Sequence, residues 1–146
     1  MVKLSDALDK LKYTADGLIP AIAQQYDTQE VLMMAWMNRA SIEETLQTGR
    51  VCYWSRSRNR FWRKGESSGQ MQVLKEFRYD CDADTILLLV DQTGPACHTG
   101  RRSCFYNKVE GDQVVIGVRS EALILYSVLA YLLPLVSLII FAALGK

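Results

Sequence analysis

The sequence predicts an α+β fold in which short strands outnumber helices. Between residues 18 and 118, apolar or alternating runs recur and are separated by Gly, Pro, Asn and Asp, a pattern typical of strands joined by turns. Before the C-terminal run, helical signals appear only over residues 5–12 and 39–47. A chain of 146 residues is long enough for one domain with a substantial core.

The N-terminal elements follow from local signals. Ser5 can cap an amphipathic helix over residues 5–12. Residues 18–25 predict a strand, and the proline within them suits a strand start or a sheet edge. Residues 31–37 form an apolar run that is too short for a free-standing helix, so we expect a buried strand there.

The next segment combines a capped helix with a strand. Asn38 is a good N-cap and Gly49 a good C-terminal stop for a helix over 39–47. Residues 50–57 predict a strand. Residues 58–69 are basic and polar, and we expect a loop.

The C-terminal half of the globular part is extended. We expect strands over 71–79, 84–92 and 113–118, a loop over 96–102, and extended structure over 103–109. Gly and Pro residues separate several of these segments.

Residues 122–145 contain no charged side chain. As a helix they would be about 36 Å long, against roughly 30 Å for the hydrocarbon core of a bilayer. We therefore predict a hydrophobic, transmembrane tail over 119–146 after a globular part over 1–118; the alternative is a buried helix in an oligomer core. Pro134 does not exclude a membrane helix.

Charge and cysteine content narrow the function classes. The net charge of +1 argues against an extended nucleic-acid groove. The N-terminus lacks a signal-peptide pattern, so we expect a reducing, cytoplasmic setting. There, the four cysteines are more often metal ligands or catalysts than disulfides.

Acidic and thiol side chains suggest two metal sites. On a strand, Asp80, Asp82 and Asp84 would share one face and Cys81 the other. The three carboxylates suit either a solvated strand edge or a hard cation such as Mg²⁺ or Ca²⁺. Cys97 and Cys104 follow in the sequence.

The thiols allow three interpretations. Cys81, Cys97 and Cys104 resemble an open catalytic zinc site, whereas adding Cys52 would give a closed structural site, and free cysteines are also often buried hydrophobes. His98, the one histidine of the chain, follows a candidate ligand and suits proton transfer near neutral pH.

A basic and aromatic segment over residues 50–66 favours a small phosphorylated nucleotide, because guanidinium groups match phosphate oxygens and aromatic faces stack on bases. A solvated basic face is the alternative. The motifs at residues 17–24, 31–38, 53–58, 62–66, 80–84 and 96–105 together resemble phosphoribosyl-AMP cyclohydrolase, the histidine-biosynthesis enzyme that opens the adenine ring. The resemblance covers about residues 5–108.

The resemblance implies a homodimer with a mixed, folded, barrel-like sheet. It implies Zn²⁺ bound by Cys81 of one subunit with Cys97 and Cys104 of the other, and Mg²⁺ bound by Asp80, Asp82 and Asp84. It gives His98 a part in proton transfer, with a zinc-bound water attacking C6 of the ring and the N1–C6 bond breaking. Expected substrate-binding residues are Trp54, Arg56, Arg58, Trp62, Arg63, Lys64 and Glu66.

The tail departs from this family. Residues 111–135 resemble the membrane tail of small inner-membrane proteins of the SoxR-reducing type. Three interpretations stay open: an enzyme tethered to the inner membrane through residues 122–145, a fusion of unrelated segments, or an altered reading frame. Competing functions are a non-catalytic, metal-stabilised nucleotide-binding module and a membrane-anchored interaction protein.

Overall fold

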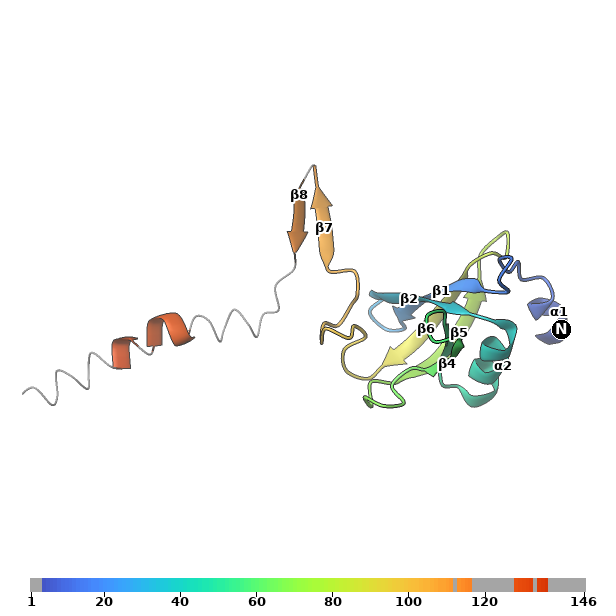
Figure 1. Ribbon diagram of the computed structural model, residues 1–146, viewed down its shortest axis with the longest axis horizontal. Helices are drawn as coiled ribbons and strands as arrows, with labels where there is room; N and C mark the ends of the chain where they lie inside the picture. The colour runs from blue at the N-terminus through green and yellow to red at the C-terminus, as the bar shows by residue number, and fades with distance from the viewer. Residues whose placement is uncertain (1–3, 112, 117–127, 133, 137–146) are drawn as a thin grey trace, which may run out of the picture. The chain divides into compact units, whose positions relative to one another are not determined.

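The computed structural model describes residues 4–111, 113–116, 128–132 and 134–136. The chain forms two compact units, Met1–Phe105 and Tyr106–Lys146. In the described residues, a six-stranded sheet and two short helices belong to the first unit, and a two-stranded sheet belongs to the second (Figure 1). The predicted α+β class is confirmed.

The six-stranded sheet has the order β4-β3-β2-β1-β6-β5. β1 and β6 pair in parallel, whereas the other neighbours pair antiparallel, so the predicted mixed sheet is confirmed. The strands are β1 (Ile19–Gln25), β2 (Val31–Met37), β3 (Cys52–Ser55), β4 (Arg60–Arg63), β5 (Gln72–Tyr79) and β6 (Ile86–Gln92).

The sheet curls until the start of β5 meets the segment that precedes β3 (Figure 1). Val51 donates its backbone N–H to the carbonyl of Gln72 at 3.0 Å, and Leu74 donates to the carbonyl of Gly49 at 2.7 Å. Strands at the two ends of the sheet order are thereby brought together around one core. The predicted barrel-like arrangement is confirmed as a half-barrel.

The parallel pair β1 and β6 supplies the centre of the core. Alternate residues of both strands are buried, because successive side chains of a strand point to opposite faces. The register places Ala21 beside Ile86 and Ala23 beside Leu88. The prediction of a buried strand over 31–37 is confirmed, since β2 contributes buried apolar side chains to the same core.

A buried polar chain crosses the interior. The Tyr53 hydroxyl donates to Gln72 Oε1 at 2.7 Å, and Gln72 Nε2 donates to Gln92 Oε1 at 2.8 Å. Gln25 Oε1 accepts from the backbone N–H of Gln92 at 3.1 Å. All four side chains are buried, and these bonds offset the cost of removing polar groups from water.

The two helices differ in how well the sequence located them. α2 (Arg39–Thr48) has the predicted N-cap. The side chain of Asn38 accepts a hydrogen bond from the Ser41 backbone N–H, and the Ser41 hydroxyl accepts one from the Asn38 backbone N–H. Gly49 ends the helix with φ of 71°. α1 (Leu4–Leu8) is shorter than the predicted helix over 5–12, because the chain turns directly after it.

The expected loop over residues 58–69 was wrong at Arg60–Arg63, since β4 pairs there with β3. Two aromatic contacts join these strands: Tyr53 with Trp62 at 5.5 Å and Trp54 with Phe61 at 5.6 Å between ring centroids. Cross-strand aromatic packing therefore stabilises an edge strand whose ends are arginines.

The second unit contains β7 (Asn107–Glu110) and β8 (Gln113–Ile116), paired antiparallel. This confirms most of the predicted strand over 113–118, whereas the extended segment expected over 103–109 becomes a strand only at its end. A π-helical turn, η1, spans Val128–Leu132. Most of the helix predicted over 122–145 lies outside the described residues, and no helix within the described ranges is long and apolar enough to span a membrane.

Candidate functional site

The acidic segment is a turn between β5 and β6, so the expected strand alternation of its carboxylates was wrong. Asp80 Oδ1 accepts backbone hydrogen bonds from Asp84 at 3.0 Å and Thr85 at 3.1 Å. Ala83 takes a positive φ of 64°. The side chain of Asp80 thus replaces strand pairing and folds the segment back on itself, as aspartates often do in turns.

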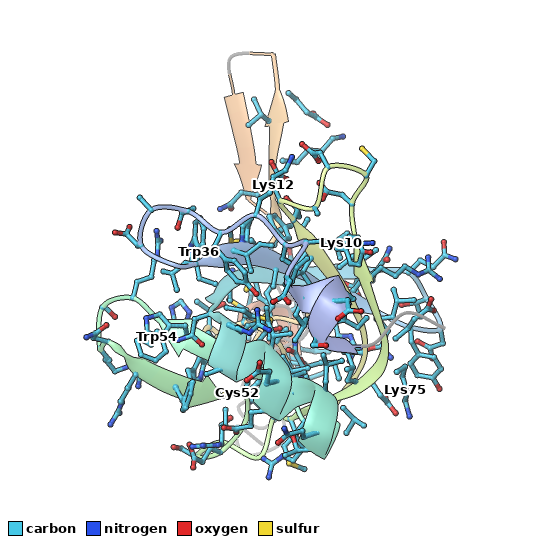
Figure 2. All side chains as sticks on the ribbon, turned by 90° about the vertical axis from the view of Figure 1, so that its right-hand side faces the viewer. Lys10, Lys12, Trp36, Cys52, Trp54 and Lys75 are labelled. Carbon is cyan, nitrogen blue, oxygen red and sulfur yellow. The ribbon has the colours of Figure 1, made fainter. Side chains whose placement is uncertain are left out.

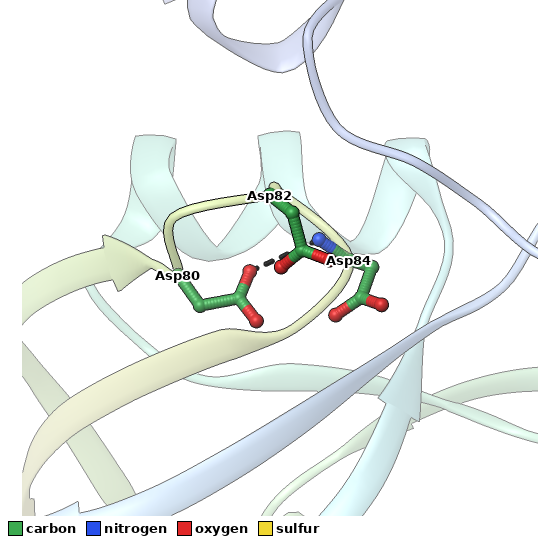
Figure 3. Close-up of side chains that lie close together, drawn as sticks. All are labelled: Asp80, Asp82 and Asp84. Carbon is green, nitrogen blue, oxygen red and sulfur yellow. Dashed lines mark hydrogen bonds between the residues drawn. The ribbon is translucent and has the colours of Figure 1, made fainter.

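This turn brings the three aspartates together (Figure 3). One carboxylate oxygen from each of Asp80, Asp82 and Asp84 lies within 4.8 Å of the other two, and all three residues are exposed. Slight desolvation opposes ionisation of Asp80, but backbone N–H donors from Thr85 and Asp84 outweigh it and lower its pKa. The donor set is three hard oxygens, which fits Mg²⁺ or Ca²⁺.

Two of the three candidate zinc ligands lie on a second loop, which follows β6. A backbone hydrogen bond closes a tight turn at Cys97, whose N–H donates to the carbonyl of Arg101 at 3.1 Å. Cys104 is tied to β2 because its N–H donates to the Leu32 carbonyl at 2.7 Å. The loop therefore presents both thiols from a backbone that is held at each end.

The two thiols have different environments. The Cys97 sulfur lies 3.1 Å from Thr99 Oγ1, and this hydrogen bond lowers the pKa of Cys97. Cys104 is exposed as a residue, but partial burial of its sulfur raises its pKa to about 11, with the neighbouring Cys97 adding to the effect. A bound metal ion would deprotonate both thiols.

Cys81 does not join them. It is exposed and belongs to the aspartate turn before β6, whereas the thiol loop follows β6. A seven-residue strand spans roughly 20 Å. Within the described part of one chain, only the aspartates form a cluster of three close metal-ligating side chains.

A cleft of about 930 Å³ lies between the thiol loop and β4 with the turn after it. Seven of the residues expected from sequence line it: Arg58, Trp62, Arg63, Lys64, Glu66, His98 and Cys104. Trp54 and Arg56 instead line a neighbouring hollow of about 640 Å³. The structure therefore divides the predicted substrate-binding residues between two adjoining spaces.

Two of the cleft cations are engaged within the protein. Arg63 forms a bidentate pair with Glu44, at 2.5 and 2.9 Å. Lys64 is only 7% exposed, and its ammonium donates to the carbonyl of Ala96 at 2.8 Å. Burial lowers the pKa of Lys64, opposed by the nearby thiolates. Lys64 thus anchors the thiol loop at the residue before Cys97.

Gly65 is required by the backbone beside this lysine. Its φ is +82°, and a Cβ added there would lie 2.5 Å from the backbone carbon of Gln70. The glycine lets the chain turn sharply, which places Lys64 and Glu66 on the wall of the cleft.

Several lining residues were not expected from sequence: Met33, Met34, Ser67, Ser68 and Gln70. The serines and Gln70 lie in the polar segment that follows the basic motif. Their closeness to that motif in the sequence could have identified them as candidates for the cleft lining. The methionines belong to β2, where the apolar run does not reveal which side chains will border a cavity.

The family of this chain follows from comparisons with known proteins. A family model described as phosphoribosyl-AMP cyclohydrolase matches residues 33–106. A phosphoribosyl-AMP cyclohydrolase of Halorhodospira halophila is 70% identical over 112 residues, covering 77% of this chain and 79% of that protein. One from Magnetococcus marinus is 74% identical over 106 residues, covering 73% of this chain and 81% of that protein.

The C-terminal segment has a different relative. A second family model, described as positive regulator of sigma(E), RseC/MucC, matches residues 96–146 and overlaps the first match at 96–106. It covers a minority of the chain, whereas the first match covers 74 of its 146 residues (33–106) and is supported by long relatives of high identity. The chain belongs to the phosphoribosyl-AMP cyclohydrolase family.

Proposed function

We propose that this chain hydrolyses the N1–C6 bond of the adenine ring in phosphoribosyl-AMP, as its family membership in histidine biosynthesis implies. The observation that carries the proposal is that His98, Cys104 and Trp62 line one cleft in a chain about 70% identical to named cyclohydrolases. The cleft is large enough for a nucleotide.

The residues fit the two metals expected from the family. Cys97 and Cys104 offer soft thiol donors on one loop, and Zn²⁺ accepts such ligands. The partner subunit's Cys81 would supply the third, because the chain's own Cys81 lies at the other end of β6. Asp80, Asp82 and Asp84 would hold Mg²⁺. Zinc bound there would supply a water that ionises near neutral pH.

The chain's own residues would then bind and exchange protons. His98 is exposed on the cleft wall beside Cys97, where it can take a proton and return it to the departing N1. Trp62 offers a flat apolar face for the base. Lys64 holds the loop that carries both ligand and histidine. A second subunit is needed for this site, and we propose a homodimer.

The tail is assigned separately. We propose that the chain divides into a cyclohydrolase-like part over residues 1–118 and a tail over 119–146. We also propose that the protein acts in the cytoplasm and contacts the membrane through residues 122–145. The uncharged sequence of that run supports the contact. In the described part, Tyr131 and Leu135 are exposed apolar side chains of this segment. Co-sedimentation of the full chain with lipid vesicles would test it.

The test of the activity uses the purified full chain and phosphoribosyl-AMP. We expect the near-ultraviolet absorbance to change as the ring opens, in proportion to zinc content measured by atomic emission. A His98→Asn variant should keep its zinc and lose most of its turnover. A zinc-loaded chain without turnover would instead favour the non-catalytic nucleotide-binding module.

A further inference from the structure

Two arginines with no acidic partner in the described part of the chain line the hollow beside the cleft. It is lined by Arg56 and Arg58, and no carboxylate is among its lining residues: Met34, Ala35, Trp36, Trp54, Ser55, Arg56, Ser57, Arg58 and Trp62. Within the described part of the chain, neither arginine forms a salt bridge with Asp or Glu. By contrast, the cleft cations Arg63 and Lys64 are engaged internally.

The hollow also holds its arginines in place. The Arg56 guanidinium lies over the Trp36 ring at 4.8 Å from the centroid, which leaves its N–H edges for another partner. Arg58 Nε donates to Ser55 Oγ at 3.3 Å. Trp36 stands opposite Trp54 where β2 pairs with β3, and both lie on the same side of the first unit (Figure 2). The sequence motif did not include Trp36 among substrate-binding residues.

The hollow and the cleft adjoin each other, because Met34, Arg58 and Trp62 line both. A substrate whose base lies against Trp62 can therefore extend into either space. We propose that the hollow formed by Trp36, Trp54, Arg56 and Arg58 is a phosphate subsite that binds one of the two terminal phosphomonoesters of the substrate, outside the cleft that holds the reacting ring. This assignment rests on the proposed function.

Three chemical features fit a phosphomonoester. Guanidinium groups donate paired N–H bonds to phosphate oxygens. The hydroxyl of Ser57 adds a further donor on the lining. The indole rings of Trp36 and Trp54 add apolar lining beside the exposed guanidinium groups. The remaining phosphate would then meet Arg60, which lines the cleft.

Direct binding tests the subsite without turnover. The chain has three tryptophans, Trp36, Trp54 and Trp62, so their indole N–H signals in a ¹⁵N-labelled full chain report on the hollow, with assignments from single Trp→Phe variants. Inorganic phosphate, titrated at constant ionic strength, should shift the Trp36 and Trp54 signals in a saturable way. Arg56→Gln should weaken that binding by about tenfold or more.

The control is Arg50→Gln, because Arg50 is exposed and lines neither space. This variant removes the same charge and should titrate like the parent. A Trp62 shift alone, or equal titrations of the parent and Arg56→Gln, would overturn the subsite.

Kinetics separate the subsite from the proposed reaction. With phosphoribosyl-AMP as substrate, Arg56→Gln should raise KM by about tenfold to about a hundredfold, with a much smaller effect on kcat, because it removes binding common to substrate and transition state. An unchanged KM would contradict the subsite. If the parent chain shows no turnover, the proposed function fails, and the phosphate titration still decides whether the hollow binds phosphate.

Discussion

The aspartate turn and the thiol loop lie at opposite ends of β6 and are built in different ways. The turn gathers three carboxylates within five residues through bonds from its own backbone to Asp80. The thiol loop brings Cys97 close to Cys104 but depends on distant segments: Leu32 of β2 binds its backbone, and Lys64 anchors its start. The aspartate cluster therefore forms locally, whereas the two thiols of the loop are brought together by tertiary structure, and the proposed zinc site adds a third thiol from a partner subunit.

The largest effect should come from the thiol loop. We expect Cys97→Ser to lower kcat/KM by at least about a hundredfold and to reduce zinc per chain, because it removes a proposed zinc ligand. The control is Cys52→Ala: Cys52 is buried against α2 (Figure 2), and burial raises its pKa to about 12. That variant should keep its zinc. Full zinc content in Cys97→Ser would remove the thiol loop from the metal site.

A mixing experiment tests whether the third thiol comes from a partner. Cys81→Ser and Cys97→Ser chains should each be inactive alone. After unfolding and refolding together in equal amounts, activity should return to about a quarter of the parent value, because half of the dimers are mixed and each has one intact site. No recovery, with mixed dimers shown by mass spectrometry, would place all three thiols of a site in one chain.

The anchor of the thiol loop should have the next largest effect. We expect Lys64→Met to lower kcat about tenfold, because the carbonyl of Ala96 loses a buried charged donor. KM should change less than about threefold, because Lys64 holds the loop and does not bind the substrate. If Lys64 instead bound a phosphate of the substrate, its replacement by Met would raise KM. The control is Lys75→Met, since Lys75 is exposed and pairs with Asp91; steady-state kinetics of both variants measure the difference.

A change in the aspartate turn should alter the Mg²⁺ dependence of the activity rather than the assembly of the dimer. We expect Asp82→Asn to raise the Mg²⁺ concentration for half-maximal activity about tenfold, because one anionic ligand becomes neutral. Asp91→Asn, outside the turn, serves as the control. Identical Mg²⁺ titrations of Asp82→Asn and the parent would show that the turn is an acidic surface without a functional cation.

The smallest effect concerns the ion pair at the cleft wall. Hydrogen bonding to Arg63 lowers the pKa of Glu44. Because the folded-state pKa is depressed, the stabilisation is present above the ordinary value of 4.5 and is lost as pH falls through the lower folded-state value. We expect Glu44→Gln to lose about 0.5 kcal/mol at pH 7 and less near pH 3, measured by urea unfolding. An equal loss at both pH values would assign the effect to packing.

Local signals predicted most of the elements in the first unit. Asn38 and Gly49 marked the ends of α2, and the apolar run over 31–37 marked β2, because capping and burial act over a few residues. The strand β4 was missed, since it pairs with β3 and packs its aromatic rings on those of β3. Cross-strand partners are not visible in a short window of sequence.

The sequence by itself determined the chemistry of this protein: which side chains can bind soft metals, hard metals, phosphate or protons, because donor type is a property of the residue. Only the tertiary structure decided how they act together. Residues Asp80–Asp84 form a turn with clustered carboxylates instead of the expected strand. Arg63 and Lys64 form hydrogen bonds within the protein, and Trp36 lies beside Arg56. Position depends on the backbone path and on partners far along the chain, which residue type alone does not specify.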